Sequence, residues 1–126
     1  MNSNRAIRSY RDLQVWQKGM NIAEQCYLIT KNYPKQEMYG MSSQIQRAAV
    51  SIPANIAEGY GRNSKGEYIQ FLRIAQGSLK ELETHLILSI RVKLATSDVA
   101  NPILEECESL GRMIRALIRS IQASIQ

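Results

Sequence analysis

Residues 64–94 read SKGEYIQFLRIAQGSLKELETHLILSIRVKL, and no proline interrupts them. Apolar side chains recur every three or four residues, which is the spacing of one helix face. Ser64 followed by Glu67 fits a capping box, in which the two side chains satisfy backbone donors at a helix start. A helix from Lys65 to Leu94 would be ~45 Å long and the longest element of the chain. The predicted face consists of Tyr68, Phe71, Ala75, Leu79, Leu82, Leu86 and Ile90.

This long helix also carries apolar residues away from its main face, so it is apolar on more than one side. We therefore expect something besides its own bundle to cover the second side. The residues concerned are Ile69, Leu72, Ile74, Ile87 and Leu88.

A first helix is expected ahead of it, with Asp12 as N-cap and a stop before Pro34, because proline disfavours helical geometry in the residue before it. Its apolar residues alternate spacings of three and four, which predicts a narrow seam. The predicted seam is Leu13, Trp16, Met20, Ala23 and Tyr27.

A second helix is expected to be capped by Ser42 or Ser43 and to end at Gly59 and Gly61. Pro53 falls inside it, where it removes one hydrogen bond and clashes with the preceding turn, so we expect a kink or a break there. The predicted seam is Ile45, Ala48 or Ala49, Ile52 and Ile56.

A fourth helix is expected to be capped by Ser97 or Asp98, with Pro102 tolerated in its first turn. No alternating pattern is long enough for a strand. Three short connectors predict an all-α, up-down-up-down antiparallel four-helix bundle with a kinked second and a long third helix. It forms one domain, residues 12–126, after a basic arm, residues 1–11. The fourth seam is Ile103, Cys107, Leu110, Ile114, Leu117 and Ile121.

The net charge is positive, with sixteen Lys and Arg against eleven Asp and Glu in 126 residues. Such a surface permits binding to phosphates. In the fourth helix, Glu105, Glu106 and Glu108 lie near the start and the arginines lie near the end. The helix macrodipole favours this order of charges, and it is the favoured explanation for these arginines. No aromatic residues are interleaved with the arginines, so contacts to phosphates are expected and base reading is not. The candidate arginines are Arg5, Arg8, Arg11, Arg112, Arg115 and Arg119.

Sequence patterns for catalysis, metals and cofactors are missing. His85 is the one histidine, whereas a di-iron bundle needs a Glu-x-x-His pair from each of two helices. Cys26 and Cys107 are far apart, and no phosphate-binding glycine loop is present. We therefore expect no enzyme activity, no metal and no cofactor. The longest uncharged run has ten residues, too few to span a membrane, and a reducing cytoplasm is the expected location.

Polar residues interrupt the apolar side of two helices. Asn55 and Glu58 lie near the proline of the second helix, and Glu81 and Glu83 flank an apolar residue of the third. They could form a polar pocket for a ligand. The favoured interpretation is structural, in which Asn55 and Glu58 satisfy backbone groups freed by Pro53 or a neighbouring helix, because buried polar groups are usually satisfied locally.

Two longer stretches resemble a known family. Residues 48–59 read AAVSIPANIAEG, and residues 71–84 read FLRIAQGSLKELET. With YRDLQVWQK at 10–18 and YGM at 39–41, they resemble the bacterial four-helix-bundle proteins encoded within intervening sequences of 23S rRNA genes. The resemblance covers residues 10–121. It implies a bundle that assembles into a ring, commonly a homopentamer, with no established enzymatic activity. It further implies that the motif positions determine fold or assembly: Ser51, Pro53, Asn55, Glu58, Gly59, Gly77, Ser78, Glu81 and Glu83.

Three hypotheses for function follow. The first is a cytoplasmic oligomer that binds RNA or a ribonucleoprotein through its arginines. The second is a protein-interaction scaffold with no nucleic-acid role, and the third is a small-molecule site at Asn55 and Glu58. None of the three involves a membrane.

Overall fold

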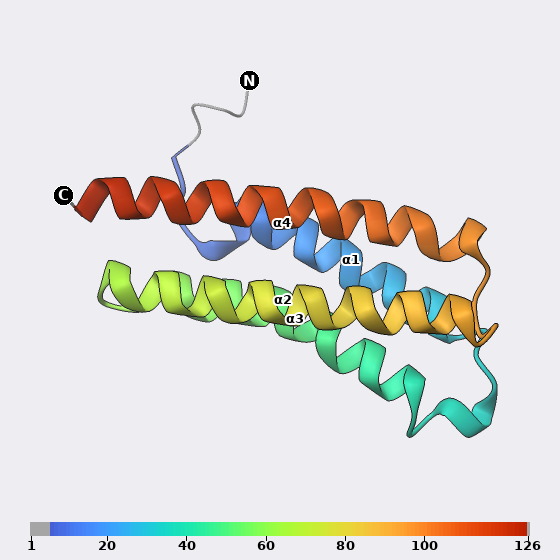
Figure 1. Ribbon diagram of the computed structural model, residues 1–126. Helices are drawn as coiled ribbons and strands as arrows, with labels where there is room; N and C mark the ends of the chain where they lie inside the picture. Colours follow the sequence, from blue (N-terminus) through green and yellow to red (C-terminus); the bar gives the residue numbers. More distant parts are fainter. Residues whose placement is uncertain (1–5, 126) are drawn as a thin grey trace.

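Four helices pack side by side in the computed structural model, which describes residues 6–125 (Figure 1). Each helix runs antiparallel to the next, α1 contacts α2 and α4, and α3 contacts the same two helices. The described residues form no strand. The predicted all-α four-helix bundle is therefore confirmed. The helices are α1 Gln14–Thr30, α2 Met41–Tyr60, α3 Lys65–Arg91 and α4 Ser97–Ile125, and the 3-10 turns are η2 Tyr10–Asp12 and η3 Lys35–Glu37.

The seams of α2, α3 and α4 form the core largely as predicted, although Tyr68, Phe71 and Ile90 of α3 are only partly buried. Ile45, Ile52 and Ile56 of α2 are fully buried. In α4 the predicted seam is buried except at Leu117, which is only partly buried, whereas the neighbouring Ile118 is 4% exposed. The remaining core of α3 and α4 comprises Leu72, Ala75, Leu79, Leu82, Leu86, Ile103, Cys107, Leu110, Ile114 and Ile121.

The predicted seam of α1 is wrong at two of its five residues, whereas Ala23 is buried and Leu13 and Trp16 pack partly against the core. Met20 and Tyr27 are 37% and 47% exposed, although both lie at seam spacing. Helix α1 has two apolar faces, each with helical spacing, and the bundle buries the other one. The buried face consists of Val15, Gly19, Ile22, Ala23, Cys26 and Ile29.

The second side of α3 is only partly free. Leu72, which the spacing placed on that side, is fully buried in the core, and Ile69 packs partly against it. Ile74, Ile87 and Leu88 are 43–46% exposed.

Two predicted N-caps are wrong. Asp12 caps no α-helix, because its carboxylate accepts hydrogen bonds from the backbone of Arg8 and Ser9 and closes η2. Ser42 is buried within α2, whose first donor, the Met41 N–H, is satisfied by the Glu37 carboxylate at 3.0 Å.

The start of α3 agrees with the sequence prediction, whereas its end does not. Ser64 is its N-cap, with Oγ accepting from the Glu67 N–H at 3.1 Å, as predicted. The helix ends at Arg91, before the predicted Leu94, because Lys93 adopts a left-handed conformation with φ of 67°. At 27 residues α3 is shorter than α4, which has 29, so the expectation that α3 is longest is also wrong.

Helix α2 continues through Pro53 without the break that the proline could cause. Its N-terminal half diverges from α3 in Figure 1. On the other side, Gly19 of α1 approaches Pro53, and a Cβ on Gly19 would lie 3.5 Å from the proline Cβ. The glycine lets α1 and α2 cross closely at this level.

Candidate nucleic-acid interface

The fold gathers positive charge in one half of the bundle. Turn η2, the α2–α3 turn and the end of α4 lie together in Figure 1, and Lys65 donates a hydrogen bond to Ser124 at 3.0 Å. The basic half, defined as residues 6–19, 53–77 and 112–125, carries nine Lys and Arg against three Asp and Glu. The remaining described residues carry six against eight. Its cations are Arg8, Arg11, Lys18, Arg62, Lys65, Arg73, Arg112, Arg115 and Arg119.

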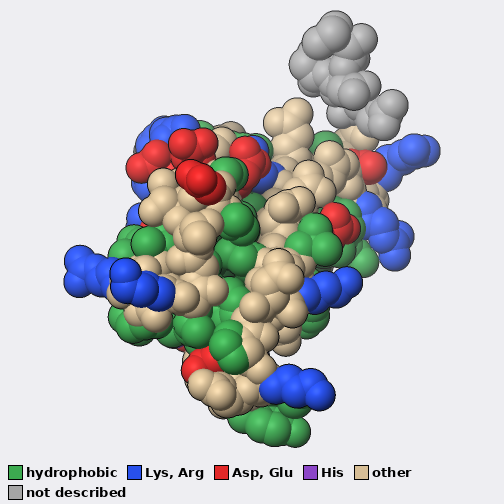
Figure 2. Space-filling model, turned by 90° about the vertical axis from the view of Figure 1, so that its right-hand side faces the viewer, with side chains coloured by type: hydrophobic (Ala, Val, Ile, Leu, Met, Phe, Trp, Pro, Cys, Tyr) green, Lys and Arg blue, Asp and Glu red, His purple; other side chains and the backbone are tan. Residues whose placement is uncertain are grey.

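The opposite end of the bundle is mixed in charge. Figure 2 looks at this end, where acidic and basic side chains both lie on the surface and several acidic ones gather at the upper left. Phosphate groups would meet repulsion there from the carboxylates that α4 supplies near its start. These are Asp98, Glu105, Glu106 and Glu108.

Two of the N-terminal arginines lie at turn η2. The Arg11 N–H donates to Ser9 Oγ at 3.1 Å, and the Arg11 guanidinium lies 5.2 Å from the centre of the Tyr10 ring. Tyr10 in turn packs edge-on against Trp16, with ring centroids 5.3 Å apart. Arg8 and Arg11 are both exposed, and Arg5 lies outside the described residues.

The three arginines of α4 are exposed and largely unneutralised. Arg112 is 3.9 Å from the Glu108 carboxylate, a distance at which an exposed pair contributes little. Arg115 extends past Gly111, and neither it nor Arg119 forms an ion pair among residues 6–125. Helical spacing places them along about 10 Å of one helix.

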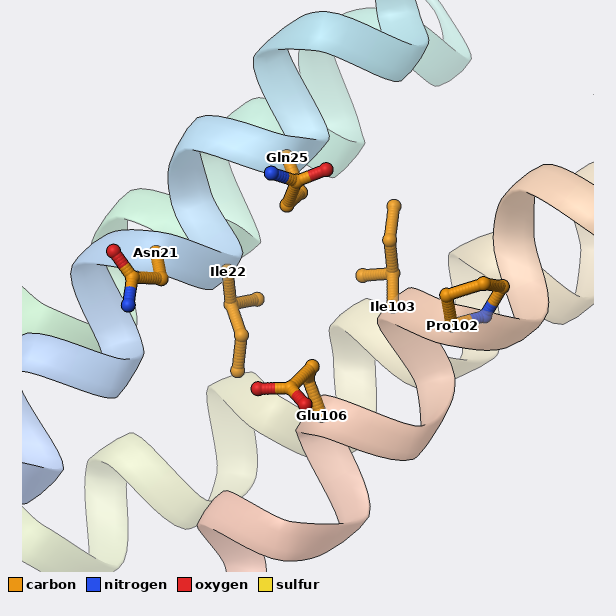
Figure 3. A pocket seen from close by; sticks show the side chains of 6 residues that line it. All are labelled: Asn21, Ile22, Gln25, Pro102, Ile103 and Glu106. Carbon is orange, nitrogen blue, oxygen red and sulfur yellow. The ribbon is translucent and has the colours of Figure 1, made fainter.

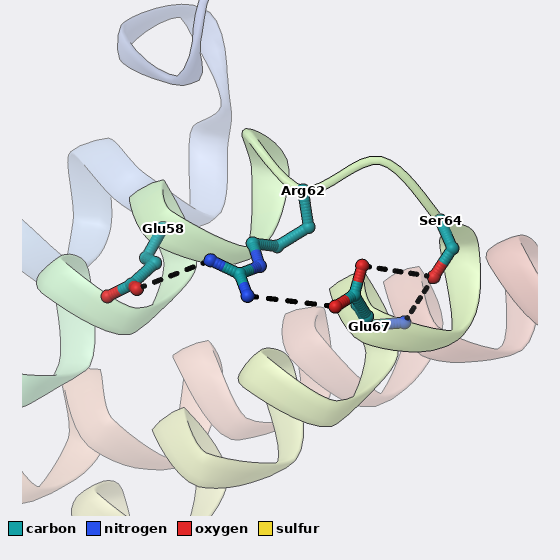
Figure 4. Close-up of polar contacts among 4 residues, drawn as sticks. All are labelled: Glu58, Arg62, Ser64 and Glu67. Atoms are coloured by element: carbon teal, nitrogen blue, oxygen red, sulfur yellow. Dashed lines mark hydrogen bonds and ion pairs between the residues drawn. The ribbon is translucent and has the colours of Figure 1, made fainter.

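Four further cations of the basic half were missed by the sequence analysis. Arg62 is already paired, because it lies 3.8 Å from Glu58 and 3.6 Å from Glu67 (Figure 4). Its guanidinium also sits over the Phe71 ring. Arg62 thereby links the end of α2 to the start of α3. Lys18 is paired with a glutamate of α4, whereas Lys65 and Arg73 are exposed and form no ion pair within the described part of the chain.

The polar residues near Pro53 are not brought together. Asn55 Nδ2 donates to the Ser51 carbonyl at 2.8 Å and to Ser51 Oγ at 2.9 Å, and Ser51 Oγ is 2.8 Å from Ser78 Oγ. This network joins α2 to α3 without reaching the carbonyl that Pro53 leaves without a donor. Glu58 is exposed and contacts Arg62.

Comparison with known proteins identifies the family. The model of the 23S rRNA-intervening sequence protein family matches residues 11–116. The chain belongs to this family. It is similar to the crystal structure of a protein of unknown function from the S23 ribosomal protein family of Bacteroides thetaiotaomicron, with 29% identity and a TM-score of 0.75. The similarity covers 82% of this chain and 97% of that one. No curated protein matches the sequence.

In this family member, two motif glycines have opposite surroundings. A Cβ on Gly59 would lie 2.6 Å from Phe71 Cβ, so α2 and α3 meet without space for a side chain. A Cβ on Gly77 would meet nothing within 4 Å. Glu81 is exposed and lies 3.6 Å from His85 Nε2, and Glu83 is 3.1 Å from the Lys80 ammonium.

The protein buries both of its thiols. Cys26 and Cys107 are fully buried and unpaired, and burial raises the pKa of Cys26 to about 12 and that of Cys107 as well. Raised thiol pKa values oppose formation of the nucleophilic thiolate. Within residues 6–125 no three His, Cys, Asp or Glu side chains are grouped to hold a metal ion. No helix there has both the length and the hydropathy of a membrane span.

A second surface feature is an apolar hollow between α1 and α2. It measures about 620 Å³, and one of its lining residues, Glu24, is charged. Leu28 and Val50 within it are 53% and 44% exposed. We call it the α1–α2 groove; its lining is Met20, Ala23, Glu24, Tyr27, Leu28, Val50 and Pro53. The seam predicted for α1 supplies three of these residues. The sequence therefore identified this apolar face of α1 but not what packs against it.

Proposed function

We propose that this protein is a non-enzymatic, cytoplasmic, oligomeric member of its family that binds RNA, alone or in a ribonucleoprotein, through phosphate contacts at the basic half. The charge segregation carries the proposal, with nine cations against three carboxylates on one half of the bundle. Exposed guanidinium groups on α4 and η2 supply donors suited to phosphate oxygens.

Salt-dependent binding tests this proposal. Counterion release makes phosphate binding fall steeply as salt rises. Retention of cellular RNA by the protein, measured by filter binding from low to high salt, should therefore decline strongly. Retention that is unchanged between the two salt conditions would contradict the proposal.

A charge-matched pair of variants locates the surface. Arg115→Gln combined with Arg119→Gln should weaken RNA binding and reduce the salt slope by about two phosphate contacts. Lys35→Gln combined with Arg91→Gln removes the same charge from exposed sites in the other half and should leave the slope almost unchanged. Equal losses from both pairs would show that net charge matters and that the basic half does not.

The α1–α2 groove favours assembly through protein contacts. An exposed apolar hollow of this kind marks an interaction site on a soluble protein, and helix-spaced residues such as Met20, Ala23 and Tyr27 suit a partner helix. We propose that the groove is covered in a homo-oligomer, with a pentameric ring as the expected form. A scaffold that docks another protein is the alternative.

Light scattering after size exclusion tests assembly. Leu28→Lys should shift the oligomer towards the monomer, because a charge would be buried in the contact. Val92→Lys is the matched control, since Val92 is 55% exposed and lies outside the groove. An unmodified chain that elutes as a monomer would contradict assembly.

A further inference from the structure

A small cavity lies between α1 and α4, outside the α1–α2 groove. It measures about 300 Å³, at the lower end of the range for small-ligand sites. Ile22 and Ile103 form an apolar floor and are 1% and 4% exposed. Figure 3 shows its lining: Asn21, Ile22, Gln25, Pro102, Ile103 and Glu106.

Polar groups from both helices border this floor. Asn21 and Gln25 lie one helical turn apart on α1, and neither side-chain amide forms a hydrogen bond within residues 6–125. Glu106 extends from α4 towards α1 (Figure 3). Two amides and a carboxylate thus face solvent beside buried isoleucines.

The carboxylate of this cavity already binds an ammonium group. Lys18 lies one turn before Asn21 on α1, and its Nζ is 2.7 Å from Glu106 Oε1. The Lys18 side chain is only 23% exposed, so its alkyl stem lies against the bundle while its charged end reaches the carboxylate. The contact is an example, within the chain itself, of an alkylammonium group bound by the Glu106 carboxylate.

The surroundings select for a cation with an alkyl body. Among the described residues, Glu106 is the one charged residue in the lining of this cavity, so an anion would meet repulsion there. The isoleucine floor favours an alkyl chain, since burying apolar surface is favourable. A phosphate group, by contrast, suits the basic half of the molecule.

We propose that the α1–α4 cavity binds an alkylammonium group, either a lysine side chain of a partner segment or a free short-chain amine. The alkyl chain lies on Ile22 and Ile103, and the ammonium pairs with Glu106 and the amide oxygens of Asn21 and Gln25. Lys18 competes for the same carboxylate, so it limits the affinity.

Nuclear magnetic resonance with n-pentylammonium chloride tests the site in the intact protein. The side-chain amide signals of Asn21 and Gln25 should shift saturably, whereas neutral n-pentanol should leave them in place. Lys18→Met should tighten binding about twofold to fivefold, because it removes the ion pair that competes for Glu106. Glu106→Gln should weaken binding about fivefold or more, and the matched control Glu105→Gln should change it less than Glu106→Gln does.

The results separate the outcomes. The proposal would be overturned if pentanol caused equal shifts or if no shift occurred. It would also be overturned if Glu105→Gln and Glu106→Gln had equal effects, or if Lys18→Met bound the amine more weakly. Binding of the peptide acetyl-Gly-Lys-Gly-amide, with none of acetyl-Gly-Leu-Gly-amide, would identify a lysine side chain as a ligand. Binding of the free amine without the peptide would identify a small amine. Because Lys18→Met and Glu106→Gln act in opposite directions, a folding defect in one variant cannot imitate the pattern.

Discussion

Gly59 and Gly77 predict opposite responses to the same substitution. Replacing glycine by alanine within a helix stabilises it by about 1 kcal/mol when nothing else changes. At Gly77 the added Cβ meets nothing within 4 Å, so Gly77→Ala should stabilise the monomer by about that amount. The expected rise in Tm is about 4 °C for a chain of this size.

Gly59 faces a contact that cannot relax cheaply. The new Cβ would lie 2.6 Å from Phe71 Cβ and 3.2 Å from the Tyr68 carbonyl oxygen. Rotating the Phe71 ring cannot move its Cβ, so α2 and α3 must separate where they join. Overpacking costs about 1–3 kcal/mol, which exceeds the helix-propensity gain over most of that range. We expect a net loss of up to about 2 kcal/mol.

Urea unfolding followed by circular dichroism measures both variants. Two protein concentrations distinguish folding from assembly, because assembly makes apparent stability depend on concentration. A Gly59→Ala variant more stable than the parent would refute the reasoning. A Gly77→Ala variant that loses stability only at the concentration at which the oligomer forms would reveal a second chain packed against α3.

Three further results are expected. Because burial raises the pKa of Cys26 to about 12 and raises that of Cys107 too, the unfolded chain loses these protons first. Stability should then fall above pH 9 by up to about 1.4 kcal/mol per pH unit and thiol, and urea unfolding at pH 8 and 10 should show a smaller fall for Cys26→Ala combined with Cys107→Ala. In unfolding by urea, Asn55→Ala should cost about 1 kcal/mol while the oligomer, checked by light scattering, persists. In filter binding, Leu28→Lys should weaken RNA retention although it adds a positive charge.

The sequence predicts the bundle because three of its four helices carry one dominant seam. In α2 and α4 most outer residues are small or polar, with exceptions such as Val50 and Val99, so spacing identifies the side that is buried. In α1 both faces are apolar, and the choice between Ile22 and Met20 depends on which face meets Pro53 across Gly19. That contact joins residues about 34 positions apart, and local periodicity does not contain it.

The candidate interface was predictable to a similar extent. Spacing identifies the α4 arginines directly, because i, i+3 and i+7 positions share a helix face. Lys65 and Arg73 join them only through the antiparallel topology, which brings the start of α3 to the end of α4. Arg62 is not free to bind phosphates because it pairs with Glu58 and Glu67. This pairing depends on the shape of the α2–α3 turn, which spacing along the sequence does not predict.

In the oligomer that we propose, symmetry would couple assembly to RNA binding. In a cyclic oligomer every copy is related to the next by rotation about one axis, so the basic halves all lie at the same height along it. Their fields then add over one surface, and several phosphate contacts made together raise the overall affinity above that of a single copy. Leu28 lies in the groove and outside the basic half, so Leu28→Lys separates the two contributions. If protomer charge alone governed affinity, this variant would bind RNA at least as tightly as the parent; weaker binding means that the ring creates the binding surface.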